Sequence, residues 1–323
     1  MRLFTRVLIS LGVLGLLVFH GHAAMAQAAS RPITLVVPYP PGGSADILAR
    51  SIAQKLGAKL EQMVIVENKP GAGTAIGSKF VAESAPDGRT LLLGTVSSHA
   101  INPAMAKVGY DPVRDFVVVA PIASIPFVLV ARQDSPYQKL SDVIAAAKQK
   151  PKTIGYASAG PGTSNHLAGE MLAGATDTQL MHVPYRGSAP ALADVVAGHV
   201  PLMFDLQATA VPFIRQGKLR ALAVSSVERS NLLPDVPTIA ESGVPGFEVS
   251  AWFALFAPAK VPSEFVDRMS TEMAAIMQSP DMVHRLQELG GTPEGRSATA
   301  FAAYVKEEAD KYGKVVQAAG LTP

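Results

Sequence analysis

Short runs of apolar, strand-favouring residues alternate along the chain with segments in which apolar residues recur at helical spacing. This alternation is typical of parallel β-sheets whose faces are covered by helices. The near-continuous hydrophobicity of each run suits strands that are buried on both faces. Ligands of such sheets bind at the carboxyl ends of the strands, so polar residues just after each run are candidates for function. The predicted strands are residues 33–37, 64–67, 90–94, 153–158, 181–185, 202–206 and 219–224.

Two further apolar runs, residues 127–131 and 252–257, are bounded by prolines and lack a helix directly before them. We interpret them as strands at which the chain crosses between two domains, because nearly three hundred residues after a leader exceed what one core usually supports. Amphipathic helices near the C-terminus, the first starting at Pro262-Ser263, should pack back onto the first domain. The predicted extents are residues 27–126 plus 252–323 for domain I and 127–251 for domain II.

A glycine-rich turn joins the first predicted strand to a helix. Backbone N–H groups at a helix start have no helical partner, and they lie at the positive end of the helix dipole. Glycine lets a ligand approach this backbone closely, so the turn favours a carboxylate or phosphate. A tight turn without a ligand is the alternative. The candidate contacts are Tyr39, Pro41, Gly42, Gly43, Ser44, Ala45 and Asp46.

The second domain repeats this device after the strand at 153–158. Hydroxyl groups here can both donate and accept hydrogen bonds, which suits a carboxylate and bridging water. Capping of the following helix is an equally good explanation for Thr163 or Ser164 taken singly. The candidate contacts are Ser158, Gly160, Gly162, Thr163, Ser164 and His166.

Other polar residues follow strand ends, where they could reach a ligand or serve only as loop residues. Arg186 could pair with a second carboxylate of the ligand, or lie exposed on the rim. Asp205 could contact an amine or hydroxyl of the ligand, or orient a loop, since an isolated carboxylate repels an anion; the same argument favours a supporting role for Asp46. The candidates of this group are Thr95, Ser97, His99, Tyr185, Arg186 and Asp205.

The first 26 residues have the pattern of a secretory signal peptide. Arg2 and Arg6 precede an apolar core at 7–19, and Ala24-Met25-Ala26 supplies a small-x-small cleavage site. The apolar core is shorter than the roughly 20 residues that span a bilayer. The chain contains no cysteine, which excludes disulfides, thiol catalysis and a lipoprotein anchor. We therefore expect a soluble protein exported to the periplasm and cleaved after Ala26.

Charge gives no sign of a nucleic-acid partner. Removing the leader subtracts two arginines and no acids, so 26 basic residues remain against 26 acidic ones. No basic stripe with interleaved aromatic residues is present.

A set of motifs, in this order along the chain, resembles the Bug family of periplasmic solute-binding proteins, which serve tripartite tricarboxylate transporters. The resemblance covers essentially the whole chain after the leader. The motifs are Pro41-Gly42-Gly43-Ser44-Ala45-Asp46, Glu67-Asn68-Lys69-Pro70-Gly71-Ala72-Gly73, Pro86-Asp87-Gly88-Arg89-Thr90, Gly160-Pro161-Gly162-Thr163-Ser164-Asn165-His166, Val183-Pro184-Tyr185-Arg186-Gly187 and Pro237-Thr238-Ile239-Ala240-Glu241-Ser242-Gly243.

This resemblance implies an α/β, two-lobed periplasmic binding protein fold of type II, in which each lobe is a mostly parallel sheet flanked by helices. It further implies that the lobes close over a small carboxylated solute, held by the loops at 39–46 and 158–166, and deliver it to membrane carrier subunits. Di- and tricarboxylates, amino acids and aromatic acids all remain open as solutes. A monomer is expected.

A periplasmic hydrolase or isomerase acting on a carboxylated molecule is the alternative function. It would need a base, for which His99, His166 and Asp205 are the candidates. Residues 71–77 resemble a dinucleotide fingerprint, but the third glycine comes one residue late, so we interpret them as a turn and helix start. His166 and Glu170 lack a third metal ligand. We therefore expect no cofactor, no metal and no catalytic residues.

Overall fold

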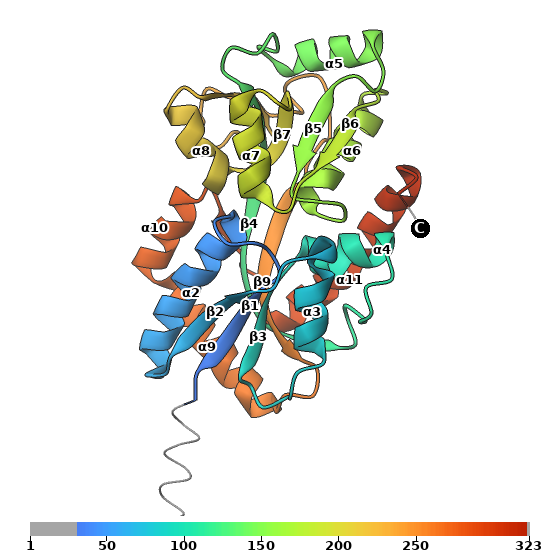
Figure 1. Cartoon of the computed structure of the whole chain (residues 1–323). Coiled ribbons are helices and arrows are strands. Elements are labelled where there is room, and N and C mark those ends of the chain that lie inside the picture. Colours follow the sequence, from blue (N-terminus) through green and yellow to red (C-terminus); the bar gives the residue numbers. More distant parts are fainter. Residues whose placement is uncertain (1–30, 322–323) are drawn as a thin grey trace, which may run out of the picture.

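The protein, in a computed structural model that describes residues 31–321, forms two lobes that are connected by long strands (Figure 1). Helices flank the sheet of each lobe, so the predicted α/β class and two-lobed architecture are confirmed. The predicted signal peptide and its cleavage after Ala26 lie outside the described residues. Within residues 31–321, no helix is long and apolar enough to cross a membrane.

The sheet of the first lobe contains two kinds of strand pairing. β1 pairs in parallel with β2 and β3, as the alternation of strands and helices predicts, whereas β9 is antiparallel to β3 and to β4. The sheet is therefore mixed, and the expectation of a mostly parallel sheet needs correction, because the chain re-enters this lobe in the opposite direction. In spatial order the strands are β2 (Val64–Asn68), β1 (Ile33–Val37), β3 (Thr90–Thr95), β9 (Ser250–Pro258) and β4 (Phe116–Arg132).

The second lobe has the same mixture of strand directions. β5 pairs in parallel with β6 and β7, while β7 and β8 are both antiparallel to β4. Each of the strands β5, β6 and β7 is followed by a helix. The turns at the carboxyl ends of these three strands face the first lobe (Figure 1). The elements are α5 (Leu140–Gln149), β5 (Gly155–Ser158), α6 (Ser164–Ala175), β6 (Met181–Pro184), α7 (Ser188–Ala197), β7 (Leu202–Leu206), α8 (Gln207–Arg215) and β8 (Leu219–Val224).

β4 belongs to both lobes. Its residues up to Pro126 pair with β9, and its residues from Phe127 to Arg132 pair with β7 and β8. The apolar pattern predicts a strand only from Phe127 because prolines interrupt the earlier part, and proline donates no hydrogen bond to a sheet. Register shifts on either side of Pro121 mark β-bulges, where a missing donor is tolerated. One continuous strand therefore connects the two lobes.

Helices from both ends of the chain complete the first lobe. α9 begins at Ser263, as predicted, and buries Met269, Met273, Ile276 and Met277. α9 and α11 both pack against β4, and α9 also contacts α2. The helices of this lobe are α2 (Ser44–Leu60), α3 (Ala75–Ala82), α4 (Asn102–Met105), α9 (Ser263–Gln278), α10 (Pro280–Glu288) and α11 (Ala298–Ala318), with short turns η1 (Ala72–Thr74) and η2 (Ser97–Ile101) and a short strand β10 (Thr292–Pro293) beside β4.

Aromatic side chains fill the core where β3 ends, and His99 is one of them. The His99 ring is fully buried and stacks on Phe256, with ring centroids 3.9 Å apart, and it lies 4.9 Å from the Phe116 ring. Trp252 packs nearby and donates from Nε1 to the buried carboxylate of Glu308 at 3.2 Å. The sequence predicts His99 as a ligand contact, but the π-helical turn η2 places its ring against Phe256 of β9, and His99 does not line the cavity between the lobes.

Acid should destabilise the protein partly through His99. Burial lowers the pKa of His99 to about 3, from 6.5 in the unfolded chain. Between these values the unfolded state binds a proton that the folded state does not, so the stability contributed by neutral His99 is present above pH 6.5 and lost as the pH falls. We expect His99→Phe to reduce the loss of unfolding free energy between pH 7 and pH 5 by about 2 kcal/mol, measured by urea unfolding.

The control for this experiment is Val227→Gln, because Val227 is 66% exposed and the change adds and removes no titratable group. This variant should show the same dependence of unfolding free energy on pH as the unaltered protein. An unchanged dependence in His99→Phe would contradict the burial of a neutral His99.

Candidate functional site

The first glycine-rich loop joins β1 to α2. Gly43 is the N-cap of α2, and Gly42 has a φ of +86°, which glycine adopts without strain. The helix begins at Ser44, so the N–H groups of its first turn have no helical partner. Ser44 and Ala45 line a cavity between the lobes. The start of α2 therefore brings unsatisfied donors and the positive end of a helix dipole to that cavity.

Asp46 stabilises this loop from outside the cavity. Its carboxylate accepts hydrogen bonds from the Gly42 N–H, from Arg50 Nε and from Asn68 Nδ2, each at 3.0 Å. Burial opposes ionisation, but the bonds from Arg50, Gly42 and Asn68 hold the pKa of Asp46 below its usual value. Asp46 does not line the cavity, which agrees with the supporting role that charge repulsion predicts.

The second glycine-rich loop joins β5 to α6. Gly160 and Gly162 have φ values of +123° and +77°, a conformation that favours glycine. The Ser158 hydroxyl accepts from the Gly160 N–H at 3.0 Å and lies 2.6 Å from Nε2 of His182. Thr163, the N-cap of α6, donates from Oγ1 to the Gly160 carbonyl at 2.6 Å. Ser158 and Thr163 therefore stabilise the conformation of this loop through their hydrogen bonds with Gly160.

Two polar contacts join the lobes beside these helix starts. The Ser164 N–H, at the start of α6, donates to Ser97 Oγ of the first lobe at 3.0 Å. Ser44 Oγ, at the start of α2, lies 3.4 Å from Thr209 Oγ1 of the second lobe. The two lobes are therefore closed on one another around the cavity.

A third wall comes from the start of α7 and the end of β7. Asp205, at the end of β7, accepts from Ser188 Oγ, from Thr209 Oγ1 at 2.5 Å and, more weakly, from Asn165 Nδ2 at 3.5 Å. Of the residues that form this wall, the sequence analysis predicts only Asp205 as a ligand contact. The missed signal is the pair Gly187-Ser188, which repeats the glycine-serine helix start at residues 43–44.

Asp205 is 1% exposed. Burial raises the pKa of its carboxyl group to about 6, against the opposing effect of the hydrogen bonds from Ser188 and Thr209. All of its partners are neutral, so no cation compensates its charge. A buried carboxylate without a cationic partner leaves the second-lobe wall of the cavity electronegative.

Together these walls enclose a small cavity of about 40 Å³. No basic side chain lines it, as far as the described residues go, and its single carboxylate is Asp205. The lining residues are Tyr39, Pro40, Gly43, Ser44, Ala45, Thr95, Ala159, Ser164, Asn165, Ser188, Asp205, Leu206, Ala251 and Phe253.

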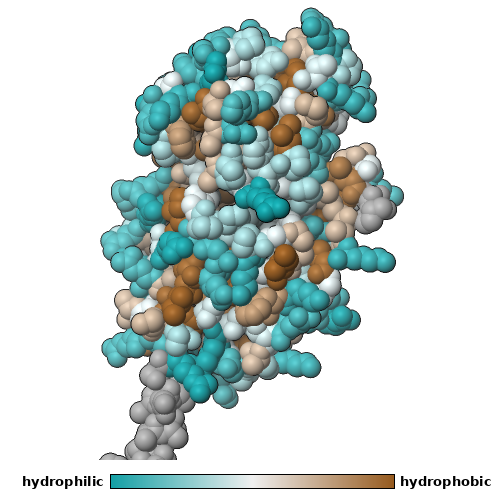
Figure 2. Space-filling model, viewed as in Figure 1, coloured by the Kyte–Doolittle hydropathy of each residue, from teal (hydrophilic) through white to brown (hydrophobic). Residues whose placement is uncertain are grey.

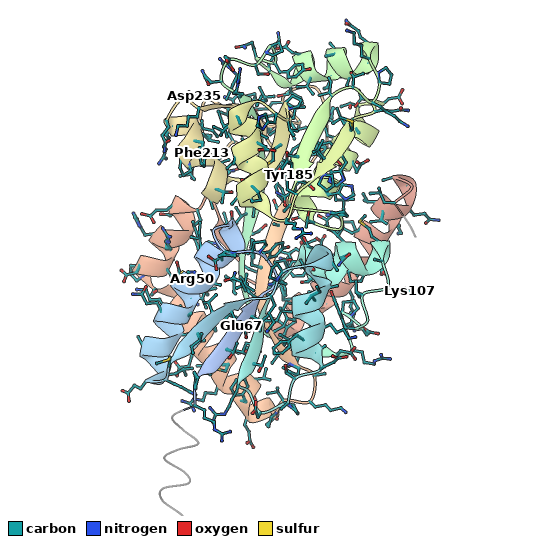
Figure 3. All side chains as sticks on the ribbon, viewed as in Figure 1. Arg50, Glu67, Lys107, Tyr185, Phe213 and Asp235 are labelled. Carbon is teal, nitrogen blue, oxygen red and sulfur yellow. The ribbon has the colours of Figure 1, made fainter. Side chains whose placement is uncertain are left out.

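A wider hollow adjoins the cavity, and Tyr39, Pro40 and Ala159 line both. Tyr185 lies at the boundary between the lobes (Figure 3), and its hydroxyl donates to Asp194 at 2.5 Å. In the view of Figure 2 the surface around this boundary is mostly pale, as expected for small and weakly polar residues. Predicted residues that line this hollow are Tyr39, Gly160, Gly162, Thr163, Tyr185 and Arg186, of which Arg186 is exposed.

Several predicted contacts line neither space. His166 is buried in the first turn of α6, and its ring stacks on His182 with centroids 3.9 Å apart. Burial, reinforced by His182, lowers the pKa of His166 to about 3. The sequence cannot separate these positions from the lining ones because both follow the same strand ends. The predicted contacts that line neither space are Pro41, Gly42, Asp46, Ser97, His99, Ser158 and His166, and their contact with a ligand stays a prediction.

The described residues contain no group of three or more histidine, aspartate and glutamate side chains that could hold a metal ion. Residues 71–77, which resemble a dinucleotide fingerprint, form η1 and the start of α3, as the turn interpretation predicts.

Comparisons with known proteins point to one family. The family model of the tripartite tricarboxylate transporter family receptor matches residues 48–321. A UPF0065 protein from the tcbD-tcbE intergenic region of Pseudomonas sp. (strain P51) is 41% identical, over 89% of this chain and 86% of that protein. Protein BugT of Bordetella pertussis is 34% identical over 90% of each chain.

Solved structures agree with this result. Rpa4515 of R. palustris, solved with adipate, superposes with a TM-score of 0.87 at 36% identity, over 91% of this chain and 98% of that one. MatC of Rhodopseudomonas palustris, solved with bound malate, gives a TM-score of 0.84 at 35% identity, over 88% and 99%. The chain therefore belongs to the tripartite tricarboxylate transporter receptor family and to its Bug group of solute-binding proteins.

Proposed function

We propose that this protein is a periplasmic receptor that captures a small carboxylated solute between its lobes. The observation that carries the proposal is that the starts of α2 and α6, one from each lobe, meet at one cavity that no basic side chain lines within residues 31–321. Unpaired helix N–H groups bind carboxylates without a formal positive charge. Structures of its relatives contain adipate and malate, which are both carboxylates.

The solute carboxylate is bound by groups from both lobes in this proposal. Backbone N–H groups at the start of α2 and the hydroxyl of Ser164, which accepts from Ser97 Oγ and keeps its own proton free, donate hydrogen bonds to it, and water bridges the longer gaps. Residues of the wider hollow contact the distal part of a longer solute. The proposed contacts are Tyr39, Gly43, Ser44, Ala45, Thr95, Ser164 and Asp205 in the cavity, and Gly160, Gly162, Thr163, Tyr185 and Arg186 in the hollow.

Closure of the lobes supplies the signal that the membrane carrier recognises. We take the lobes as residues 27–126 with 252–323, and 127–251. Ligand contacts both lobes only when they are closed, so it shifts the population toward the closed form. The protein is exported, and its leader is cleaved after Ala26. In the closed form it then docks on the membrane carrier subunits as a monomer.

The enzyme alternative has little support at this site. Of the three bases that it could use, His99 and His166 are packed in the core and lie away from the cavity. Asp205 lines the cavity, but its oxygens are occupied by Ser188 and Thr209. The receptor proposal requires no base, cofactor or metal.

A panel of small organic acids tests the receptor proposal. After unfolding and refolding to remove carried-over ligand, one or a few acids should raise the midpoint of thermal unfolding. An acid at 100 times its dissociation constant stabilises the folded state by about 2.7 kcal/mol. Amides or esters of the same acids should have no effect. A broad panel in which no carboxylate stabilises the protein would sink the proposal, and turnover of a bound acid would favour the hydrolase or isomerase.

Closure is tested by Gly73→Ala. Gly73 of the first lobe has a φ of +60°, and a Cβ there would lie 2.4 Å from the backbone oxygen of Pro161 in the second lobe. The clash should oppose closure and weaken binding of a stabilising acid by on the order of 1–3 kcal/mol, measured by calorimetry.

The matched control is Gly217→Ala, which has a similar φ of +68° but no atom within 4 Å of the new Cβ. This variant carries the backbone strain without the clash between lobes, so its affinity should match that of the unaltered protein. Equal affinities in Gly73→Ala and Gly217→Ala would contradict the closure mechanism.

A further inference from the structure

The hydrogen bonds of Asp205 determine the polarity of the cavity wall beside it. A serine or threonine hydroxyl has one proton to donate. Ser188 and Thr209 each donate theirs to the Asp205 carboxylate. What Ser188 presents to the cavity is therefore its lone pairs, and it accepts hydrogen bonds there.

The same polarity extends across to the first lobe. The Thr209 proton is already directed at Asp205, so in the 3.4 Å contact between Ser44 Oγ and Thr209 Oγ1 the donor is Ser44. Ser44 lines the cavity and thereby also presents lone pairs to it. An ionised carboxylate has about four acceptor positions, and those of Asp205 accept from Ser188, Thr209, Asn165 and the Leu206 backbone N–H. The acceptors left for a ligand are therefore the lone pairs of Ser188 and Ser44. This side of the cavity thus consists of acceptors around a buried negative charge.

We propose that the bound solute carries a hydrogen-bond donor, a hydroxyl or ammonium group, on the carbon chain next to its carboxylate, and that this donor faces the lone pairs of Ser188 and Ser44 beside the buried Asp205 carboxylate. The inference rests on the proposed function, since it concerns the same cavity. None of the residues lining this cavity is basic, so the donor that this wall requires comes from the ligand. A ligand with only carboxylates and methylenes leaves these acceptors without a donor and sets like charges side by side.

The test compares acids of equal length on the refolded, unaltered protein by calorimetry at pH 7.5, where Asp205 is ionised. The four-carbon series is succinate, malate and aspartate, and the five-carbon series is glutarate, 2-hydroxyglutarate and glutamate. In at least one series, the hydroxy or amino acid should bind at least about tenfold more tightly than the unsubstituted diacid. If an unsubstituted diacid binds and its substituted counterparts bind no more tightly, the proposal fails while the receptor function stands. If none of the six acids binds, this proposal fails, whereas the receptor function fails only if the broad panel of acids also contains no acid that stabilises the protein.

A substitution at Asp205 tests the cause of this preference. In Asp205→Asn the amide N–H₂ donates to Ser188 or Thr209, which frees a hydroxyl proton for the ligand. The ratio of affinities between substituted and unsubstituted acids should then fall at least about tenfold. Asp235→Asn is the control, because Asp235 lies far from the boundary between the lobes (Figure 3) and should leave the ratio unchanged. An unchanged ratio in a folded Asp205→Asn protein would overturn the assignment, and the comparison of acids on the unaltered protein does not depend on the variant folding.

Discussion

The binding site depends on hydrogen-bond donors that the protein itself leaves unsatisfied. The first turn of a helix has N–H groups without helical partners, and such groups are costly to bury unless an acceptor reaches them. In this protein α2 starts at Ser44 in one lobe and α6 at Ser164 in the other, and both starts lie at the same cavity. The Ser164 N–H already donates to Ser97 Oγ, so in the proposed complex the carboxylate oxygens accept from free N–H groups of α2 and from the Ser164 hydroxyl, which links binding to closure.

Glycines permit the lobes to approach as closely as they do. A Cβ at Gly187 would lie 2.8 Å from the Pro40 ring, and a Cβ at Gly162 would lie 2.5 Å from Asn102 Oδ1. Both glycines also have positive φ values, so the backbone conformation and the close contact between lobes require the same residue type. The loops that offer backbone N–H groups to a ligand therefore also form the contact between the lobes.

Electrostatics in the cavity come from dipoles and one buried carboxylate. Ion pairs such as that of Arg50 with Asp46 are used to hold loops in place. No basic side chain lines this cavity within residues 31–321, so recognition there relies on hydrogen bonds. The strength of a hydrogen bond depends on its direction more than the attraction of a point charge does. Asp205 sets these directions on the second-lobe wall through Ser188 and Thr209.

The sequence by itself determined most of the strands, the α/β class, the two lobes and the two glycine-rich loops, because turns, caps and helix starts depend on residues that are neighbours in the chain. Tertiary structure decided which side chains reach the cavity. His99 follows a strand end as Thr95 does, yet packing against β9 buries it in the core. Ser44 and Thr209 meet although 165 residues separate them. Neither segment carries a local signal of that contact, since it exists only once the lobes fold and close.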